Sequence, residues 1–303
     1  MQIEERDAIV LDINWHPSGQ YLSSVGSDGF LHIFELNTDL TKAKKIFSIQ
    51  RERSVRRVQW SPDGNYLITA GFDSIGVIYK FDPKSDPVCT IYERLEGQDN
   101  EMKAARWSPD ENYIVSCSRD KSVWIWSALD GDCVAIHRGH TADVKDACFS
   151  PDGLLIGSVS FDGTFKTWDP FDEGGEIQTF SEHEGTVWSL AFNPNNNNIV
   201  TIGEDGKAIL YRKNGENYAY GNSLQLQKNL QPLYSVTYCS ESDCWIIAGS
   251  ERIIYIVDED LENVTKKIQT KHIGDINCCR PCPTNTNVLA TCSDDGTVVL
   301  NNV

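Results

Sequence analysis

The chain has 303 residues and a formal net charge of −17, with 40% hydrophobic and 10% aromatic residues. This hydrophobic content excludes a disordered chain, and the acidic balance disfavours nucleic acid, whose phosphates require clustered Lys and Arg. No apolar run approaches the roughly 18 residues of a membrane helix, and the N-terminus lacks the basic start and apolar core of a signal peptide. Ten dispersed cysteines suit a reducing compartment. We therefore expect a cytoplasmic or nuclear protein without membrane or nucleic-acid contacts.

A unit of 42 to 47 residues recurs along the whole chain. Each unit has an aromatic-X-Pro step or a degraded form of it, an apolar run, a small polar residue and then an acidic residue, here called the anchor. This spacing is typical of a four-stranded propeller blade. It predicts an all-β, seven-bladed β-propeller that forms one domain over residues 1–303. The anchors are Asp28, Asp73, Asp120, Asp162, Asp205, Glu251 and Asp295.

Short segments between turn residues, such as 122–126, are apolar and lack a period of 3.6 residues, which predicts strands rather than helices.

A second position recurs in step with the anchors and supports the same repeat. The residue six positions after the anchor is aromatic in the first five repeats and not in the last two. These residues are Phe34, Tyr79, Trp126, Trp168, Tyr211, Val257 and Asn301.

Closure of the ring requires one strand from each end of the chain. The sequence stops at Val303, just after the expected third strand of the seventh repeat. An open propeller would leave unpaired strand edges. We therefore expect residues 1–6 to supply the outermost strand of the last blade.

The fourth repeat has a set of buried polar residues: His140, Ser160, Asp162 and Trp168. A buried carboxylate needs partners, and an imidazole, a hydroxyl and an indole N–H supply them. A hydrolytic triad uses similar residue types, but the anchor recurs in repeats without the histidine, such as the first. We interpret the four residues as a structural tetrad and expect no catalytic site and no cofactor.

Cys278, Cys279 and Cys282 form the one cluster with metal-like spacing. Thiolates in a C-x-x-C arrangement can bind zinc or an iron-sulfur cluster. However, a second pair with matching spacing is absent from the sequence, and the segment falls on the first strand of the seventh repeat. Buried cysteine is a common core residue. We expect no metal site, and a metal-binding or redox role stays as an alternative.

The repeat register predicts which residues reach the face that carries the loops between second and third strands. Repeats five to seven place Glu204, Asp275 and Asp294 there, whereas one sector of the face combines cations with aromatic rings, the residue types that dominate interface hot spots. Pairing of the lysines with Glu101 and Asp143 is the alternative interpretation of this sector. The predicted partner-binding residues are Arg56, Phe72, Lys103, Arg119, Lys145, Phe161, Trp188 and Tyr234.

The repeat pattern resembles the WD-repeat β-propeller family over essentially the whole chain. Residues 118–126 (Ser-Arg-Asp-Lys-Ser-Val-Trp-Ile-Trp) and residues 182–192 (Glu-His-Glu-Gly-Thr-Val-Trp-Ser-Leu-Ala-Phe) are most similar to WD-repeat subunits of the cytosolic iron-sulfur assembly (CIA) targeting complex. Weaker similarities lie at 97–103, 143–145 and 71–74. Departures from the pattern include Gln98 in place of a histidine and Tyr79 in place of a tryptophan.

This resemblance implies a non-catalytic docking platform that holds no cluster itself. Its implied partners are a small MIP-type subunit, a HEAT-repeat adaptor and iron-sulfur client apoproteins, with this chain a monomer within the hetero-complex. The resemblance also implies that Arg119 lies on the top surface and matters for function. The alternatives are other WD-repeat scaffolds, such as a ubiquitin-ligase substrate receptor or a ribosome-assembly factor, which share the fold and use different surfaces.

Overall fold

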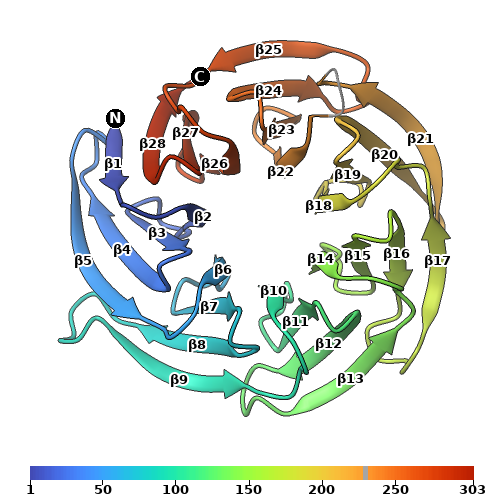
Figure 1. Cartoon of the computed structure of the whole chain (residues 1–303), viewed down its shortest axis with the longest axis horizontal. Helices are drawn as coiled ribbons and strands as arrows, with labels where there is room; N and C mark the ends of the chain where they lie inside the picture. The colour runs from blue at the N-terminus through green and yellow to red at the C-terminus, as the bar shows by residue number, and fades with distance from the viewer. Residues whose placement is uncertain (228–230) are drawn as a thin grey trace.

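A computed structural model, which describes residues 1–227 and 231–303, has seven four-stranded antiparallel sheets arranged as blades around a central axis (Figure 1). Blades 1 to 6 each use four consecutive strands, from β2–β5 to β22–β25. The predicted all-β seven-bladed propeller is confirmed. In the described part of the chain, no helix is long and apolar enough to span a bilayer.

In blades 1 to 6 the polypeptide runs outward, from an innermost strand beside the axis to an outermost strand at the rim, whereas β1 supplies the outermost strand of blade 7. The innermost strands are β2 (Val10–Trp15), β6 (Val55–Trp60), β10 (Met102–Trp107), β14 (Val144–Phe149), β18 (Val187–Phe192), β22 (Leu233–Cys239) and β26 (Ile276–Cys282). The second strands are β3 (Tyr21–Gly26), β7 (Tyr66–Gly71), β11 (Tyr113–Ser118), β15 (Ile156–Ser160), β19 (Ile199–Gly203), β23 (Cys244–Gly249) and β27 (Asn285–Ser293).

The two outer positions of the blades follow the same order. The third strands are β4 (Phe30–Leu36), β8 (Gly76–Phe81), β12 (Ser122–Ser127), β16 (Phe165–Trp168), β20 (Lys207–Asn214), β24 (Ile253–Asp258) and β28 (Thr297–Asn302). The outermost strands are β5 (Ala43–Gln50), β9 (Cys89–Leu95), β13 (Cys133–Arg138), β17 (Glu176–Phe180), β21 (Asn217–Gln225), β25 (Val264–Gln269) and β1 (Gln2–Glu5).

The core consists of apolar layers between neighbouring blades. Each of seven clusters of buried side chains joins two adjacent blades. For example, Trp126 of blade 3 packs with Ile68 and Ile78 of blade 2. The second strands are buried on both faces, which explains why they consist of apolar and small residues without an alternation of apolar and charged ones.

Strand β1 closes the ring, as the sequence predicted. It pairs antiparallel with β28, and Glu4 lies opposite Val298. Beyond the strand, the Arg6 N–H donates to the Gly296 carbonyl at 2.9 Å. The two ends of the chain therefore share the last blade (Figure 1).

Two backbone features bring side chains to one face of the ring. The residue after each anchor has a positive φ, and it is a non-glycine at Ser74, Lys121 and Arg252. In addition, every innermost strand has a bulge at its second residue, and a bulge re-aims the side chain of the extra residue. The bulged residues are Leu11, Arg56, Lys103, Lys145, Trp188, Tyr234 and Asn277.

Candidate docking face

Arg119 lies in the turn between β11 and β12, directly before the anchor of blade 3. Its backbone N–H donates to the Glu101 carbonyl at 3.0 Å, which fixes the turn against the start of β10. Its side chain is 54% exposed, and its guanidinium lies 3.5 Å from Glu101 and 3.9 Å from Asp143. Both separations exceed the donor–acceptor distance of a good hydrogen bond. The guanidinium is thus oriented by two carboxylates and still accessible to a ligand.

Lys103 lies on one side of Arg119. Its ammonium is hydrogen-bonded to Glu101 and sits 4.3 Å from the centre of the Phe72 ring. A cation over an aromatic face is attracted by the ring quadrupole. The contact of Lys103 with Phe72 joins blades 3 and 2, and Glu101 compensates the lysine charge.

Lys145 occupies the matching place on the other side. Its ammonium lies 3.5 Å from Asp143 and 5.2 Å from the ring centres of both Phe161 and Trp188. Burial lowers its pKa from the usual lysine value. Phe161 is 58% exposed. Lys103 and Lys145 thus pair with Glu101 and Asp143, as the alternative interpretation of this sector expected. Arg119 is the most accessible cation of the sector.

Arg56 and Tyr234 complete the set at its two ends. Arg56 is half-buried and donates to the Leu11 carbonyl at 3.2 Å. Tyr234 packs edge-on against Trp188, with ring centres 5.5 Å apart, and burial together with Asp275 raises the pKa of Tyr234 to about 12. The eight predicted residues therefore form a continuous arc over blades 2 to 6, but Arg56 contributes little accessible charge.

A buried polar network supports the face in blade 4. The His140 imidazole contacts the Asp162 carboxylate at 3.0 Å through Nδ1 and a serine hydroxyl at 2.8 Å through Nε2, and the Trp168 indole donates to the same hydroxyl. Burial raises the pKa of Asp162, but the bonds from His140 and Thr164 outweigh it and hold this pKa well below the usual value.

The serine in this network is Ser158, so the prediction of Ser160 was wrong. The Ser160 hydroxyl instead donates to the carbonyls of Ala142 and Asp143. Both serines point to the same side of β15, because side chains two residues apart share a face. Ser160 lies at the end of the strand, beyond the reach of the imidazole.

Two residues that the sequence reasoning missed replace histidine in blades 1 and 2. Arg6 donates to Asp28 at 3.1 Å and to Ser24 at 2.6 Å. Arg51 likewise donates to Asp73 and, at 3.1 Å, to Thr69. Each arginine precedes its anchor by 22 residues, the offset that separates His140 from Asp162. That offset was available in the sequence.

Blade 7 keeps the network although its sixth-position residue is not aromatic. His272 contacts Asp295 at 3.0 Å and Thr291 at 2.8 Å. The Asn301 amide donates to the Thr291 hydroxyl at 2.8 Å, which is the bond that Trp168 makes in blade 4. Asparagine thus replaces the hydrogen bond of the indole but not its apolar area.

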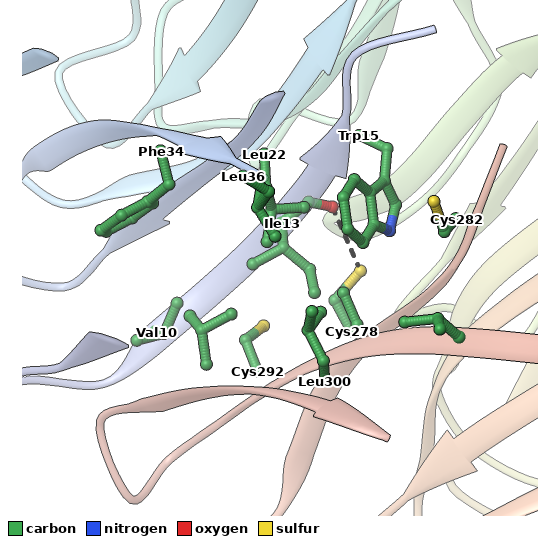
Figure 2. Close-up of a cluster of buried hydrophobic side chains, with 13 residues drawn as sticks. Val10, Ile13, Trp15, Leu22, Phe34, Leu36, Cys278, Cys282, Cys292 and Leu300 are labelled. Atoms are coloured by element: carbon green, nitrogen blue, oxygen red, sulfur yellow. Dashed lines mark hydrogen bonds between the residues drawn. The ribbon is translucent and has the colours of Figure 1, made fainter. Parts of the chain in front are cut away.

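The cysteine cluster is divided between two cores. Cys278 and Cys282 lie between blades 7 and 1, where the Cys278 thiol is 3.6 Å from the Ile13 carbonyl (Figure 2). Cys279 points the opposite way, into the core between blades 6 and 7, and burial raises its pKa. In the described residues, no group of three or more His, Cys, Asp or Glu side chains is arranged to hold a metal ion.

Seven blades with repeated His–Asp–hydroxyl networks define a β-propeller of the WD-repeat class. The family model described as "WD domain, G-beta repeat" matches most of the chain, and the chain belongs to this family. The matched residues are 3–35, 43–80, 89–127, 131–169, 174–212 and 265–301.

Several known proteins are similar to this chain. The "Probable cytosolic iron-sulfur protein assembly protein CIAO1 homolog" of Caenorhabditis elegans is 30% identical over 94% of this chain and 91% of its own. The "Probable cytosolic iron-sulfur protein assembly protein 1" of Neurospora crassa is 31% identical over 32% of this chain and 28% of its own. The human "WD repeat and SOCS box-containing protein 1" is 32% identical over 29% of this chain and 21% of its own.

Proposed function

We propose that this protein is a non-catalytic interaction platform of cytosolic iron-sulfur protein assembly, which docks a small MIP-type subunit, a HEAT-repeat adaptor and client apoproteins. The observation that carries the proposal is the near-full-length similarity to the C. elegans protein, whose printed name assigns it to this process. The human SOCS-box relative matches only 29% of the chain. A shared WD repeat accounts for a match of that length.

The docking chemistry is assigned to the surface around Arg119. A guanidinium presents two parallel N–H donors to one carboxylate, and such a charge-assisted pair is stronger than a neutral hydrogen bond. Glu101 and Asp143 hold the Arg119 group in place without saturating it, at 3.5 and 3.9 Å. We therefore propose that Arg119 binds an acidic or carboxylate-terminated segment of a client.

The neighbouring rings supply the apolar part of the same site. Phe161 is largely exposed, and the Trp188 indole N–H is buried without a hydrogen-bond partner among the described residues. A ligand with an aromatic or aliphatic side chain beside its carboxylate fits this surface. An interface anchored by one Arg and two aromatic residues matches the composition of binding hot spots.

Affinity purification with tagged wild-type and Arg119→Glu protein, followed by mass spectrometry, tests the proposal. We expect iron-sulfur proteins and assembly factors with the wild type and loss of the clients with Arg119→Glu, because the new carboxylate repels an acidic segment. Arg119→Lys should recover part of the binding, since an ammonium lacks the planar fork. Binding should also weaken as salt rises.

Arg212→Glu is the matched control, because Arg212 is also exposed and lies on β20, the third strand of blade 5, where it pairs with Asp260 at 2.7 Å. It should bind clients normally. The melting temperature of Arg119→Glu should stay close to that of wild type, as expected for an exposed residue. Recovery of ubiquitin-ligase subunits, or of ribosome-assembly factors, in place of iron-sulfur proteins would contradict the proposed function. Normal client binding by Arg119→Glu would contradict the assigned surface alone.

A further inference from the structure

The axis of the ring holds a cluster of arginines that the docking face does not use. Arg57 on β6, Arg106 on β10 and Arg280 on β26 line one cavity of about 190 Å³. Its other polar lining comes from Asn14, Gln59 and Thr237. All of these residues belong to innermost strands, so the cavity lies inside the ring of blades (Figure 1).

The charges around this cavity do not balance. Asp146 accepts from Arg106 at 2.6 Å and lies 3.2 Å from Arg57. Asp12 lies 3.7 Å from Arg57. Arg280 donates to the Val236 carbonyl at 3.3 Å and has no carboxylate within 4 Å among the described residues. Three guanidiniums therefore share two carboxylates, in a chain whose net charge is strongly negative.

The hydrogen-bonding capacity of the cluster is also unfilled. Arg57 is 5% exposed, yet its Nε–H has no acceptor among the described residues. A buried donor without an acceptor costs free energy, most of all on a charged group. The Asp12 Oδ1 atom, 3.7 Å from Arg57, is also buried without a donor among the described residues, so it does not fill this place. The cavity is several times larger than the roughly 30 Å³ of one water and has room for an additional acceptor.

We propose that this cavity binds a small oxyanion with the chemistry of inorganic phosphate, held by Arg57, Arg106 and Arg280. The forked donors of arginine match the oxygens of phosphate and carboxylate groups. The cavity holds about 190 Å³ between buried and half-buried side chains, so it accepts a small ion or a single anionic group. This inference goes beyond the proposed docking function and does not depend on it.

Titration calorimetry and thermal melts with inorganic phosphate test the proposal on the whole protein, at constant ionic strength set with sodium chloride. We expect saturable binding of one phosphate per chain and a melting temperature that rises with phosphate concentration. A parallel titration with citrate distinguishes a phosphate site from a carboxylate site. Absence of saturable binding with both ions overturns the proposal.

Two variants locate the site. Arg280→Gln should weaken phosphate binding at least tenfold, whereas Arg212→Gln, on β20 and outside the cavity lining, should bind as wild type. Thr237→Glu places a carboxylate in the cavity lining and should abolish the phosphate response without lowering the melting temperature measured in its absence. If Arg280→Gln fails to fold, the phosphate response of Thr237→Glu alone tests whether the site lies in this cavity. Wild-type affinity in either cavity variant overturns the assignment.

Discussion

At the scale of single residues, five anchors of this propeller pair with two different kinds of side chain. Asp162, Asp205 and Asp295 pair with histidine, whereas Asp28 and Asp73 pair with arginine. Arginine carries its charge at all relevant pH values and offers more donors than imidazole. The substitutions preserve the bond to the carboxylate and to the neighbouring hydroxyl.

Arg51 should be as important to stability as a blade histidine. Its side chain is nearly buried and binds both Asp73 and Thr69. We expect Arg51→Ala to lower the free energy of unfolding by about 1.5 to 3 kcal/mol, the usual contribution of hydrogen bonds to charged groups. Chemical denaturation measures this change. Arg53→Ala removes an exposed arginine two residues away and should cost less than about 0.5 kcal/mol; equal losses would contradict the role of Arg51.

The anchors should make stability fall in acid. Burial raises the pKa of Asp295, but bonds from Thr297 and the Ile273 N–H outweigh it and lower this pKa to about 2, from an ordinary value of 3.8. A carboxylate with a depressed pKa stabilises the fold above its unfolded pKa and loses this contribution as pH falls through the folded one. We expect unfolding free energy to decline between about pH 4 and pH 2.

Denaturation curves of Asp295→Asn across this pH range provide the measurement. The variant is less stable at neutral pH but should lose less stability on acidification than wild type, because position 295 no longer titrates. Asp260→Asn removes an exposed carboxylate at the rim and should follow the wild-type pH dependence. An identical decline in Asp295→Asn and wild type would be inconsistent with the network.

At the scale of elements, strand β1 has two separate roles. Its backbone pairs with β28 and completes blade 7. The side chains of Glu4 and Arg6 form hydrogen bonds with residues of blade 1. Glu4 is buried and hydrogen-bonded to Arg6, Ser24 and His32. Burial raises the pKa of Glu4, but the contacts with His32 and Arg6 outweigh it and lower the pKa overall. The first and last blades are thus joined by backbone bonds and by charge.

Removal of residues 1–6 should destabilise the protein by about 3 kcal/mol or more, since several hydrogen bonds of about 1 kcal/mol each are lost together. It also exposes the edge of β28, which promotes aggregation. Thermal melts and size-exclusion chromatography follow both effects. The double variant Gln2→Ala and Glu5→Ala keeps the backbone pairing and removes exposed side chains, so it should behave as wild type. A truncated protein with an unchanged melting temperature would refute the role of β1.

At the scale of the whole molecule, polar contacts across the axis supplement the apolar layers between blades. Asp146 is fully buried on β14 and accepts from Arg106 on β10 and from Ser189 on β18, at 2.6 and 2.8 Å. It also pairs with Arg57 on β6. Burial raises the pKa of Asp146, and the neighbouring guanidiniums outweigh that effect and lower it. One carboxylate therefore connects four of the seven blades.

Asp146→Asn should cost about 3 to 5 kcal/mol of unfolding free energy, because it removes the counter-charge of Arg106 and leaves Arg57 with only the more distant Asp12 among the described residues. Asp143→Asn removes a partly exposed carboxylate only three residues away and should cost at most about 1 kcal/mol. Denaturant unfolding of the two variants, monitored by tryptophan fluorescence, makes the comparison. Similar losses would show that Asp146 does not hold the blades together.

The features that recur in the sequence were predictable from it. Seven anchors at nearly constant spacing specify seven blades, and the expected closure of the last blade by the N-terminal residues agrees with the pairing of β1 and β28. The repeated register also placed Arg119 and its neighbours on one face, and their role in partner binding stays a prediction. The predictions of the fold succeed because each blade is a local unit whose strands follow one another in the chain.

The tertiary structure alone decided which residues meet. Ser158 and Ser160 lie on the same side of β15, so the strand period cannot distinguish them. Only the position of the His140 ring in the fold shows that Ser158 is the serine within its hydrogen-bonding distance. Compensation of Lys103 and Lys145 by Glu101 and Asp143 depends on side-chain geometry at the bulges. Arg57, Arg106 and Arg280 are distant in sequence, and each resembles an ordinary strand residue. They share one cavity because closure of the ring brings the innermost strands to a common axis.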